Sequence, residues 1–291
     1  LYPEDAELSG RARVLNIKKL PSGKGIGMLN HAAGKATFRP TVNKAGTYVL
    51  TLLIYKQLTV REQYLQVIVN GKINEVFTPT AKGFTPTGRV QTMIDLKEGA
   101  NEIILTNPVV TAADSSFIQY RRMGNALKAA AHKTAVEKGT REKPILFSIC
   151  EWGMAFPWHW GSRAGNMWRT TPDINASWKS IHLIYNHNIK LYKYACPGAW
   201  NDPDMLEVGN GKLTDNENKT HFSLWCMMAA PLILGNDVRL LVGSDGAPIE
   251  NHPVLKTVTN RNLIAIDQDE LGKPAKRLKK IHGIDIIGRP L

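Results

Sequence analysis

Hydrophobic and polar residues follow two different patterns along the chain, and the change falls near residue 122. Before this point, short β-like runs alternate with turn residues, and no helical stretch interrupts them. Asn70-Gly71 and Gly99-Ala100-Asn101 are typical of hairpin turns. This spacing favours an antiparallel sandwich or jelly roll over residues 1–121. The runs that we expect to be strands are 36–38, 46–55, 64–69, 90–96 and 102–105.

After residue 122 the hydrophobic period becomes that of a helix. Met123, Leu127, Ala131 and Ala135 share one face of a helix predicted over 123–138, and Gly139 provides its end. Strands predicted at 145–150, 231–234 and 285–287 then alternate with helices predicted at 176–186 and 221–230. Such alternation predicts βα units and a parallel sheet.

Composition excludes some classes of partner. The 291 residues suffice for two domains, and no apolar run of 18 residues occurs, so we expect no membrane-spanning helix. The net charge of +12 raises the question of nucleic acid. Its densest clusters are Lys128–Lys143, which Glu137 and Glu142 interrupt, and Lys273–Lys280, which we interpret as a linker. Neither cluster lies in a nucleic-acid-binding motif, so we expect no nucleic-acid partner.

The cysteines indicate neither disulfides nor a metal site. Cys150, Cys196 and Cys226 are odd in number and widely spaced. Each lies among apolar or aromatic residues, which favours small buried side chains. We expect no metal ion and no cofactor.

Two groups of residues are candidates for chemistry. Asp202-Pro203-Asp204 places two carboxylates where an apolar segment ends, although the same residues are ordinary turn and helix-start chemistry. Glu151, Arg169 and Asp173 lie among tryptophans, and carboxylates beside aromatic rings are typical of carbohydrate-active sites. Burial in the core is the alternative for these tryptophans, and we favour it for Trp158 and Trp178. The tryptophans are Trp152, Trp158, Trp160, Trp168 and Trp178.

Five motifs in the second region resemble the melibiase family, glycoside hydrolase family 27. In chain order they are Ser148–Gly153, Trp168–Ile174, Pro197–Asn210, His221–Asp237 and Ile264–Gly272. The resemblance implies a (β/α)8 TIM barrel followed by a small antiparallel β domain, and hydrolysis of terminal α-D-galactosides with retention of configuration. It further implies that residues 122–272 are the C-terminal half of the barrel, from helix 4 to helix 8. Residues 273–291 would begin a linker or the C-terminal β domain.

The same resemblance implies roles for individual residues at the ends of barrel strands, where such enzymes place their chemistry. Asp173 matches the general acid/base, and Arg169 matches the arginine that binds sugar hydroxyls beside it. Asp204 matches a carboxylate that hydrogen-bonds galactose hydroxyls. The residues that line the pocket near the 2-hydroxyl match Cys150, Glu151 and Trp152.

One residue that the family requires is absent from the sequence. A retaining glycosidase needs a second carboxylate as nucleophile, about 5–5.5 Å from the first. In this family it is an Asp in a Lys-Tyr-Asp type motif, and no such motif precedes Ile145. We therefore expect the chain to be a fragment that is inactive alone, whose missing partner is the N-terminal barrel half of the same protein.

The β-rich segment resembles a carbohydrate-binding module of family 35, inserted after the fourth barrel strand. The matching stretches are Tyr2–Ala6, Gly46–Tyr48, Val69–Gly71 and Gly99–Ile103, with Asp114–Ile118 as the last strand. Ser115 and Ser116 stand near positions where such modules commonly have acidic residues, and this departure weakens the case for calcium at Glu4. A purely structural insertion is the alternative, because the aromatic residues Tyr55, Tyr64 and Phe84 fit either a sugar-binding surface or a core.

The expected substrate is an α-galactoside oligo- or polysaccharide. Trp152 is bulky and Glu151 can accept a hydrogen bond from a 2-hydroxyl, which together favour galactose. The alternatives are a related glycosidase acting on α-N-acetylgalactosaminides or β-L-arabinopyranosides, and a non-catalytic sugar-binding protein with a degenerate barrel. Because such modules accompany polysaccharide-degrading enzymes, we expect an extracellular or periplasmic bacterial protein.

Overall fold

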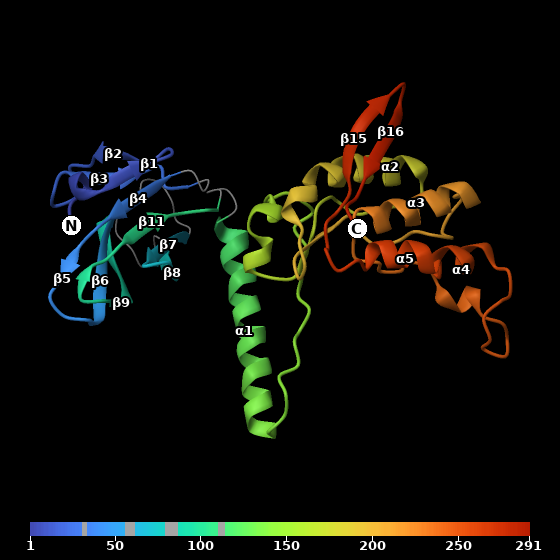
Figure 1. Ribbon diagram of the computed structural model, residues 1–291, viewed down its shortest axis with the longest axis horizontal. Coiled ribbons are helices and arrows are strands. Elements are labelled where there is room, and N and C mark those ends of the chain that lie inside the picture. Colours follow the sequence, from blue (N-terminus) through green and yellow to red (C-terminus); the bar gives the residue numbers. More distant parts are fainter. Residues whose placement is uncertain (31–33, 56–61, 79–86, 110–113) are drawn as a thin grey trace. The chain divides into compact units, whose positions relative to one another are not determined.

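The computed structural model of the chain describes residues 1–30, 34–55, 62–78, 87–109 and 114–291 (Figure 1). The chain forms two compact units, Leu1–Gln119 and Tyr120–Leu291, so that the change of unit falls close to the change in sequence pattern. Phe84 lies outside the described residues.

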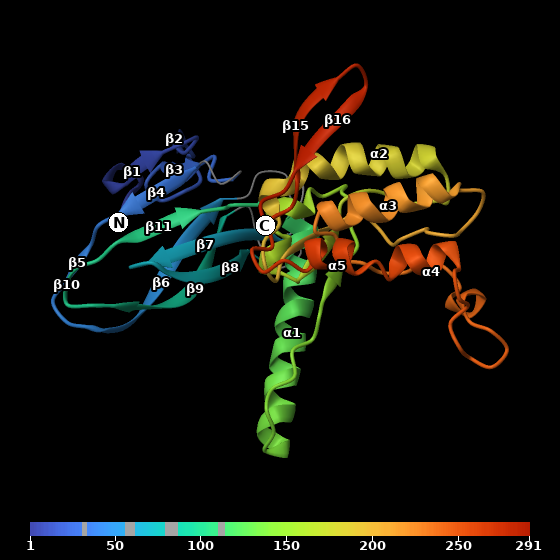
Figure 2. The same cartoon turned by 45° about the vertical axis from the view of Figure 1, so that its right-hand side comes forward.

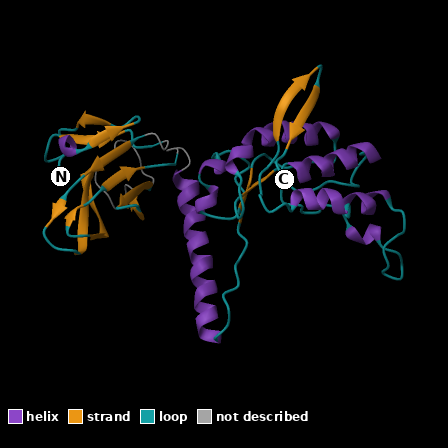
Figure 3. Ribbon diagram, in the orientation of Figure 1, coloured by secondary structure: helices purple, strands orange, loops and turns teal. Residues whose placement is uncertain are grey.

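Unit 1 is built from strands, preceded by the short 3-10 helix η1 (Pro3–Asp5) (Figure 3). Its largest sheet is antiparallel, with the order β1-β4-β11-β7-β8, and β6–β9, β2–β3 and β5–β10 form separate pairs. The strands are β1 (Glu7–Ser9), β2 (Arg13–Asn16), β3 (Lys24–Gly27), β4 (Lys35–Phe38), β5 (Thr41–Val42), β6 (Gly46–Tyr55), β7 (Gln63–Val69), β8 (Lys72–Thr78), β9 (Thr87–Leu96), β10 (Gly99–Ala100) and β11 (Ile103–Thr106).

The predicted turn at Asn70-Gly71 is confirmed. Val69 pairs with Lys72, and the two residues between them have φ of 48° and 86°. A two-residue hairpin turn of this kind needs positive φ at both positions, which Asn and Gly adopt most readily. The Asn70 side-chain oxygen also accepts a hydrogen bond from the Glu102 N–H at 2.9 Å, which joins the turn to β11.

The core of unit 1 lies between the five-stranded sheet and the β6–β9 pair. Val67 and Ile103 from the large sheet cluster with Ile94 from β9, and all three are buried. Tyr64 points to the other face of β7 and is 2% exposed. Its ring packs edge-on against the ring of Phe117, with the two ring centroids 4.7 Å apart. Tyr64 is therefore a packing residue and not part of an exposed sugar-binding surface.

The expected last strand at Asp114–Ile118 is wrong, because these residues begin helix α1 (Asp114–Lys138). Phe117 and Ile118 are neighbours in sequence and both are buried, at 0% and 1% exposure. A strand would point them to opposite faces, whereas a helix can bury both on one side. The helix predicted over 123–138 thus starts earlier, and Gly139, with φ of 60°, follows its end as expected.

Unit 2 contains a parallel sheet, which confirms that prediction. Ile149 of β12 lies beside Trp168 of β13, and Trp168 lies beside Asn201 of β14. The elements after α1 are β12 (Ser148–Ile149), η4 (Pro157–His159), η5 (Gly161–Arg163), β13 (Met167–Arg169), α2 (Trp178–Asn188), η6 (Ile189–Tyr194), β14 (Trp200–Asp202), α3 (Asp215–Met227), η7 (Val238–Leu241), α4 (Pro253–Val258), α5 (Arg261–Asp267), β15 (Lys276–Ile281) and β16 (Ile284–Gly288).

Three helices of unit 2 lie side by side, α2 next to α3 and α3 next to α5 (Figures 1 and 2). Ser177 caps α2 by accepting a hydrogen bond from the Ser180 N–H, and Thr214 and Glu217 form a capping box at α3. The core beneath them joins helix residues to residues that follow β14. Its buried members include Ile181, Ile184, Leu206, Phe222 and Trp225.

Two predicted elements of this unit differ from the structure. Residues 231–234 contribute only one bridge, from Leu234 to Leu206, instead of a full strand. The predicted linker Lys273–Lys280 is mostly strand β15, which pairs with β16. Asp285 holds this hairpin, since it binds Arg277 at 2.6 Å and accepts a hydrogen bond from the Tyr185 hydroxyl at 2.9 Å.

Within the described part of the chain, no helix combines the length and apolar character that crossing a membrane requires.

Candidate active site

The six predicted site residues lie at or just after the carboxyl ends of the parallel strands. Cys150, Glu151 and Trp152 follow β12, Arg169 ends β13, Asp173 comes four residues later, and Asp204 follows β14. Since parallel strands end at the same edge of a sheet, the fold brings together residues that are far apart in the sequence.

Arg169 joins two of the three predicted carboxylates, Asp173 and Asp204. One of its terminal nitrogens, Nη2, lies 3.1 Å from Asp173 Oδ1 and 2.6 Å from Asp204 Oδ2. The same nitrogen donates to the Thr171 carbonyl oxygen at 3.2 Å. The guanidinium therefore places Asp173 and Asp204 on one side of a single charged group.

The two carboxylates differ in access. The Asp173 side chain is 67% exposed, whereas the Asp204 side chain is 7% exposed. Asp173 can therefore reach a substrate without rearrangement. Asp204 is largely enclosed by the protein.

The Asp204 carboxylate already accepts backbone hydrogen bonds. The Met205 N–H donates to Oδ1 and the Ile174 N–H donates to Oδ2, both at 2.8 Å. Its own backbone has φ of 86°, a left-handed conformation that non-glycine residues seldom adopt. Each carboxylate oxygen has two lone pairs, so Oδ1 retains capacity for a ligand hydroxyl.

Asp202 belongs to a candidate group in the sequence, but sequence reasoning assigned it no role of its own. It is 4% exposed, and burial raises the pKa of its carboxyl to about 6, against the lowering effects of the Asp204 N–H and the Arg169 charge. The Asp-Pro-Asp spacing was the available signal, but spacing alone does not reveal which carboxylate is buried and which contacts a ligand.

Tyr120 and Gly153 hold the segment after β12. The Tyr120 hydroxyl donates to the Cys150 carbonyl oxygen at 3.0 Å. Burial raises the pKa of Tyr120, and the nearby Glu151 carboxylate adds to the effect. Gly153 has φ of 76°, and a Cβ there would lie 2.2 Å from the Thr170 carbonyl oxygen. The close approach of the two strand ends thus requires glycine.

The tryptophans divide differently from the prediction. Trp160 and Trp168 are fully buried, and the Trp168 ring N–H donates to Asn201 Oδ1 at 2.8 Å. Trp178 is 37% exposed and Trp158 is half-buried, so neither is the buried core residue that we expected. Trp152 is 49% exposed beside the site. Trp158 packs instead against the exposed rings of Phe156 and His187.

The expectation of three buried cysteines is also wrong. Cys226 is buried, but Cys150 and Cys196 are exposed. Both exposed cysteines lie next to strand ends or turns, where the apolar sequence context does not translate into burial.

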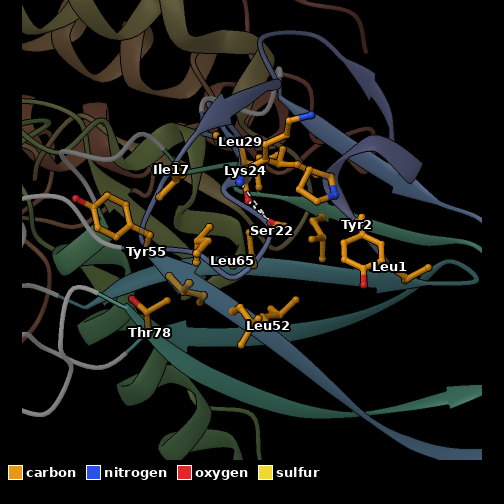
Figure 4. Close-up of a pocket in the computed structure, with 18 of the residues that line it drawn as sticks. Leu1, Tyr2, Ile17, Ser22, Lys24, Leu29, Leu52, Tyr55, Leu65 and Thr78 are labelled. Atoms are coloured by element: carbon orange, nitrogen blue, oxygen red, sulfur yellow. Dashed lines mark hydrogen bonds between the residues drawn. The ribbon is translucent and has the colours of Figure 1, made fainter.

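A cavity of about 640 Å³ lies in unit 1 (Figure 4). Leu52 and Leu65 line it from facing strands, with Ile17 nearby and the rings of Tyr2 and Tyr55 toward its edges. The lining is mostly aliphatic and includes none of the predicted site residues. Among the described residues, no group of three or more His, Cys, Asp or Glu side chains could hold a metal ion.

Comparison with known proteins assigns unit 2. Residues 120–269 match the family model described as Alpha galactosidase A. Alpha-galactosidase 2 of Arabidopsis thaliana is 42% identical over 149 residues, 51% of this chain and 35% of its own length. Alpha-galactosidase A of Cellvibrio japonicus is 42% identical over 173 residues, 56% of this chain and 40% of its own length.

Structural comparison agrees. The crystal structure of alpha-galactosidase I from Mortierella vinacea matches with a TM-score of 0.50 and 28% identity, over 60% of this chain and 44% of that one. The chain thus spans between a third and a half of the length of these relatives. The family match covers more than half of this chain and includes every predicted site residue, so the chain belongs to the Alpha galactosidase A (melibiase) family.

Proposed function

We propose that the protein containing this chain is a glycoside hydrolase that removes terminal α-D-galactosyl residues with retention of configuration. The main support for the proposal is the arrangement of Asp173, Arg169 and Asp204 at the carboxyl ends of parallel strands. The exposed carboxylate of Asp173 lies beside the enclosed pair of Arg169 and Asp204. Membership of the family and the names of the relatives support it.

Asp173 would act as the general acid/base. In a retaining mechanism this carboxyl first protonates the leaving glycosidic oxygen and then removes a proton from the attacking water. Its exposure allows both transfers, and the Arg169 contact at 3.1 Å restrains its position. Arg169 and the free capacity of Asp204 Oδ1 would bind sugar hydroxyls.

The nucleophile would be an Asp outside this chain. Retention requires a carboxylate about 5–5.5 Å from the acid/base. Asp204 is held by two backbone N–H groups and by Arg169, which lowers its nucleophilicity, and Asp202 is buried. We therefore propose that the N-terminal half of the barrel supplies the nucleophile and that residues 122–272 form the second half.

Galactose is the proposed sugar. Trp152 and Glu151 follow β12 near the proposed position of the 2-hydroxyl, where a large ring leaves little room for an N-acetyl group. Tyr120 on α1 holds this segment at Cys150, and Gly153 lies close to Thr170, the residue after β13, so the fixed shape of the segment can discriminate between substituents.

For unit 1 we propose a jelly-roll module, inserted after the fourth barrel strand, that binds carbohydrate. The antiparallel sheets of this unit and its strand-and-turn pattern support the architecture. Glu4 is paired with Lys24 at 2.6 Å, so a cation of the protein itself already balances this carboxylate, which argues against calcium there. An extracellular or periplasmic location is part of the same proposal.

The test is hydrolysis of p-nitrophenyl α-D-galactopyranoside by the complete protein and by its Asp173→Asn variant. We expect the variant to lose about 10²- to 10⁴-fold in kcat/KM, the usual range for removing a general acid/base. Asp245→Asn, at an exposed turn where the Asp245 side chain accepts a hydrogen bond from the Ala247 N–H, is the matched control and should keep wild-type activity.

Parallel assays separate the alternatives. Activity on p-nitrophenyl α-N-acetylgalactosaminide or β-L-arabinopyranoside, without activity on the galactoside, would replace the proposed sugar and keep the family. Binding of galactose without hydrolysis of any of these substrates would favour the alternative hypothesis, a non-catalytic sugar-binding protein with a degenerate barrel.

A further inference from the structure

Asp202 is a buried carboxylate that no substrate can touch. It is the last residue of β14 and is 4% exposed. Its Oδ1 accepts a hydrogen bond from the Asp204 N–H at 2.8 Å, reaching across Pro203. A side chain that bonds the backbone two residues ahead forms an Asx turn, which fixes local conformation. The role of Asp202 must therefore be exerted through Asp204.

Asp204 is the residue that needs to be fixed. Its φ of 86° is uncommon for a residue with a side chain, and such a conformation persists only where the surroundings impose it. The Asp202 carbonyl oxygen is itself held by Thr170, the residue after β13, because it accepts hydrogen bonds from the Thr170 N–H at 2.9 Å and from the Thr170 hydroxyl at 3.2 Å. The turn is thus held by hydrogen bonds at Asp202, whereas its other end, Asp204, has the strained backbone conformation.

Displacement of Asp204 would reach the rest of the site. Asp204 Oδ2 contacts Arg169 at 2.6 Å and the Ile174 N–H at 2.8 Å, and Ile174 directly follows Asp173. A shift of about 1 Å in a group that positions a substrate is enough to impair an enzyme strongly. The Asp202–Asp204 hydrogen bond therefore lies at the base of the whole arrangement.

We propose that Asp202 is a positioning residue whose buried oxygen holds the left-handed backbone of Asp204, and thereby places Arg169 and the Asp173 segment for substrate binding. This inference rests on the proposed function for its kinetic consequences, but its structural part stands without it. What Asp202 supplies is the acceptor atom and not the charge.

The hydrogen-bond acceptor of Asp202 and its negative charge can be removed separately by substitution. Burial disfavours the ionised form of Asp202, which raises its pKa to about 6. Asn offers the same oxygen in the same place without a charge, whereas Leu has a similar size and no acceptor. Asp202→Asn should therefore preserve the site, and Asp202→Leu should loosen it.

The first measurement is hydrogen–deuterium exchange of the Asp204 amide in the complete protein, without any substrate. In Asp202→Leu we expect this amide to exchange about tenfold faster or more, the effect of losing one buried hydrogen bond. In Asp202→Asn it should exchange at nearly the wild-type rate. Asp267→Asn, at a buried carboxylate on α5 that contacts none of these residues, is the control for loss of a buried charge.

The second measurement is the kinetics of the same variants on the galactoside. KM should rise about tenfold in Asp202→Leu, with a smaller change in kcat, and both constants should return to near wild type in Asp202→Asn. If the Leu variant does not fold, Asp202→Ala takes its place, and the Asn variant still decides between acceptor and charge.

Two results would overturn the inference: an Asp204 amide that exchanges at the wild-type rate in the Leu or Ala variant, or an Asn variant as impaired as the Leu variant. If the wild-type protein does not hydrolyse the galactoside, the proposed function fails. The exchange comparison then still tests the role of Asp202.

Discussion

The carboxylates at the sheet edge of unit 2 differ in their surroundings from three surface carboxylates of unit 1. In unit 1, Glu4, Glu7 and Asp95 each pair with a lysine or arginine at the surface, and every partner is about half exposed or more. In unit 2, Asp204 and Asp173 share Arg169 at the edge of a parallel sheet, and both Arg169 and Asp204 are enclosed.

Exposed charge pairs at the surface therefore differ from enclosed charges that position the groups of a site. When an exposed ion pair forms, each charged group replaces contacts with water by contacts with its partner, so the pair contributes little to the free energy of unfolding. An enclosed arginine that serves more than one acceptor must be held by the surrounding structure, and removing it leaves a buried carboxylate uncompensated. The comparison predicts that equivalent substitutions have very different effects in the two units.

Among substitutions of the paired cationic residues, the largest effect is expected from Arg169→Lys. Lysine carries the charge but lacks the planar fork that reaches several acceptors at once. We expect kcat/KM on the galactoside to fall by about 100-fold or more, because both Asp173 and Asp204 lose their positions. The free energy of unfolding of unit 2 should also fall, by about 3–5 kcal/mol if the pair with Asp204 is lost entirely.

Arg39→Lys in unit 1 is the matched control for that substitution, since Arg39 contacts Glu7 and Glu102 at the exposed surface. It should leave both hydrolysis and the urea midpoint of unfolding unchanged. Equal losses of activity and stability from Arg39→Lys and Arg169→Lys would show that the enclosed arginine is no more important than the exposed one.

A second prediction concerns pH and the buried carboxyl of Asp267. Burial raises its pKa from the ordinary 3.8 to about 6. The folded state therefore binds the proton more tightly than the unfolded state, so this residue makes stability fall as the pH rises from about 4 to about 6. Asp267→Asn removes this dependence.

The variant should therefore be more stable than the wild type at pH 7, by up to about 3 kcal/mol, and nearly equal to it at pH 4. Urea unfolding at the two pH values measures the difference. A gain that is the same at both pH values would show that the ionisation of Asp267 is not its source.

A smaller effect is expected from Tyr120→Phe, which removes the hydroxyl that binds the Cys150 carbonyl oxygen. The segment carrying Glu151 should loosen, and KM for the galactoside should rise about three- to tenfold, the value of one hydrogen bond. If Glu151 binds the 2-hydroxyl, the effect should nearly vanish with a 2-deoxygalactoside. Tyr192→Phe, at a 40% exposed tyrosine on η6, is the control.

The smallest effect is expected from Lys24→Met in unit 1. Lys24 pairs with Glu4 at 2.6 Å, but both side chains are about half exposed, at 45% and 50%. The urea midpoint of unfolding should not change measurably. A new affinity for calcium in this variant, measured by calorimetry, would sharpen the proposal that Lys24 takes the place of a cation at Glu4.

The sequence was sufficient where local rules decide the structure. Strand β6 has the predicted bounds, Gly46–Tyr55, and the Asn70-Gly71 turn follows from the conformations that these two residues tolerate. The motifs placed six site residues at strand ends, and the structure puts all of them at the edge of one parallel sheet.

The sequence was insufficient where tertiary contacts decide. Trp158 and Trp160 are two residues apart, yet only Trp160 is fully buried. Asp114–Ile118 was predicted as a strand from its resemblance to the last strand of a family 35 module, but these residues begin a helix in which Phe117 packs against Tyr64. In the same way, only the fold distinguishes the buried carboxylate of Asp202 from the exposed one of Asp173.

We propose that Asp173 acts as the acid/base of a retaining α-galactosidase, and the Asp173→Ala variant of the complete protein tests this role. The variant is given p-nitrophenyl α-D-galactopyranoside with and without sodium azide. Azide attacks a glycosyl–enzyme intermediate without needing a general base, so we expect azide to restore turnover and to yield α-D-galactosyl azide. Formation of the β-anomer, or full activity of the variant without azide, would show that Asp173 does not have this role.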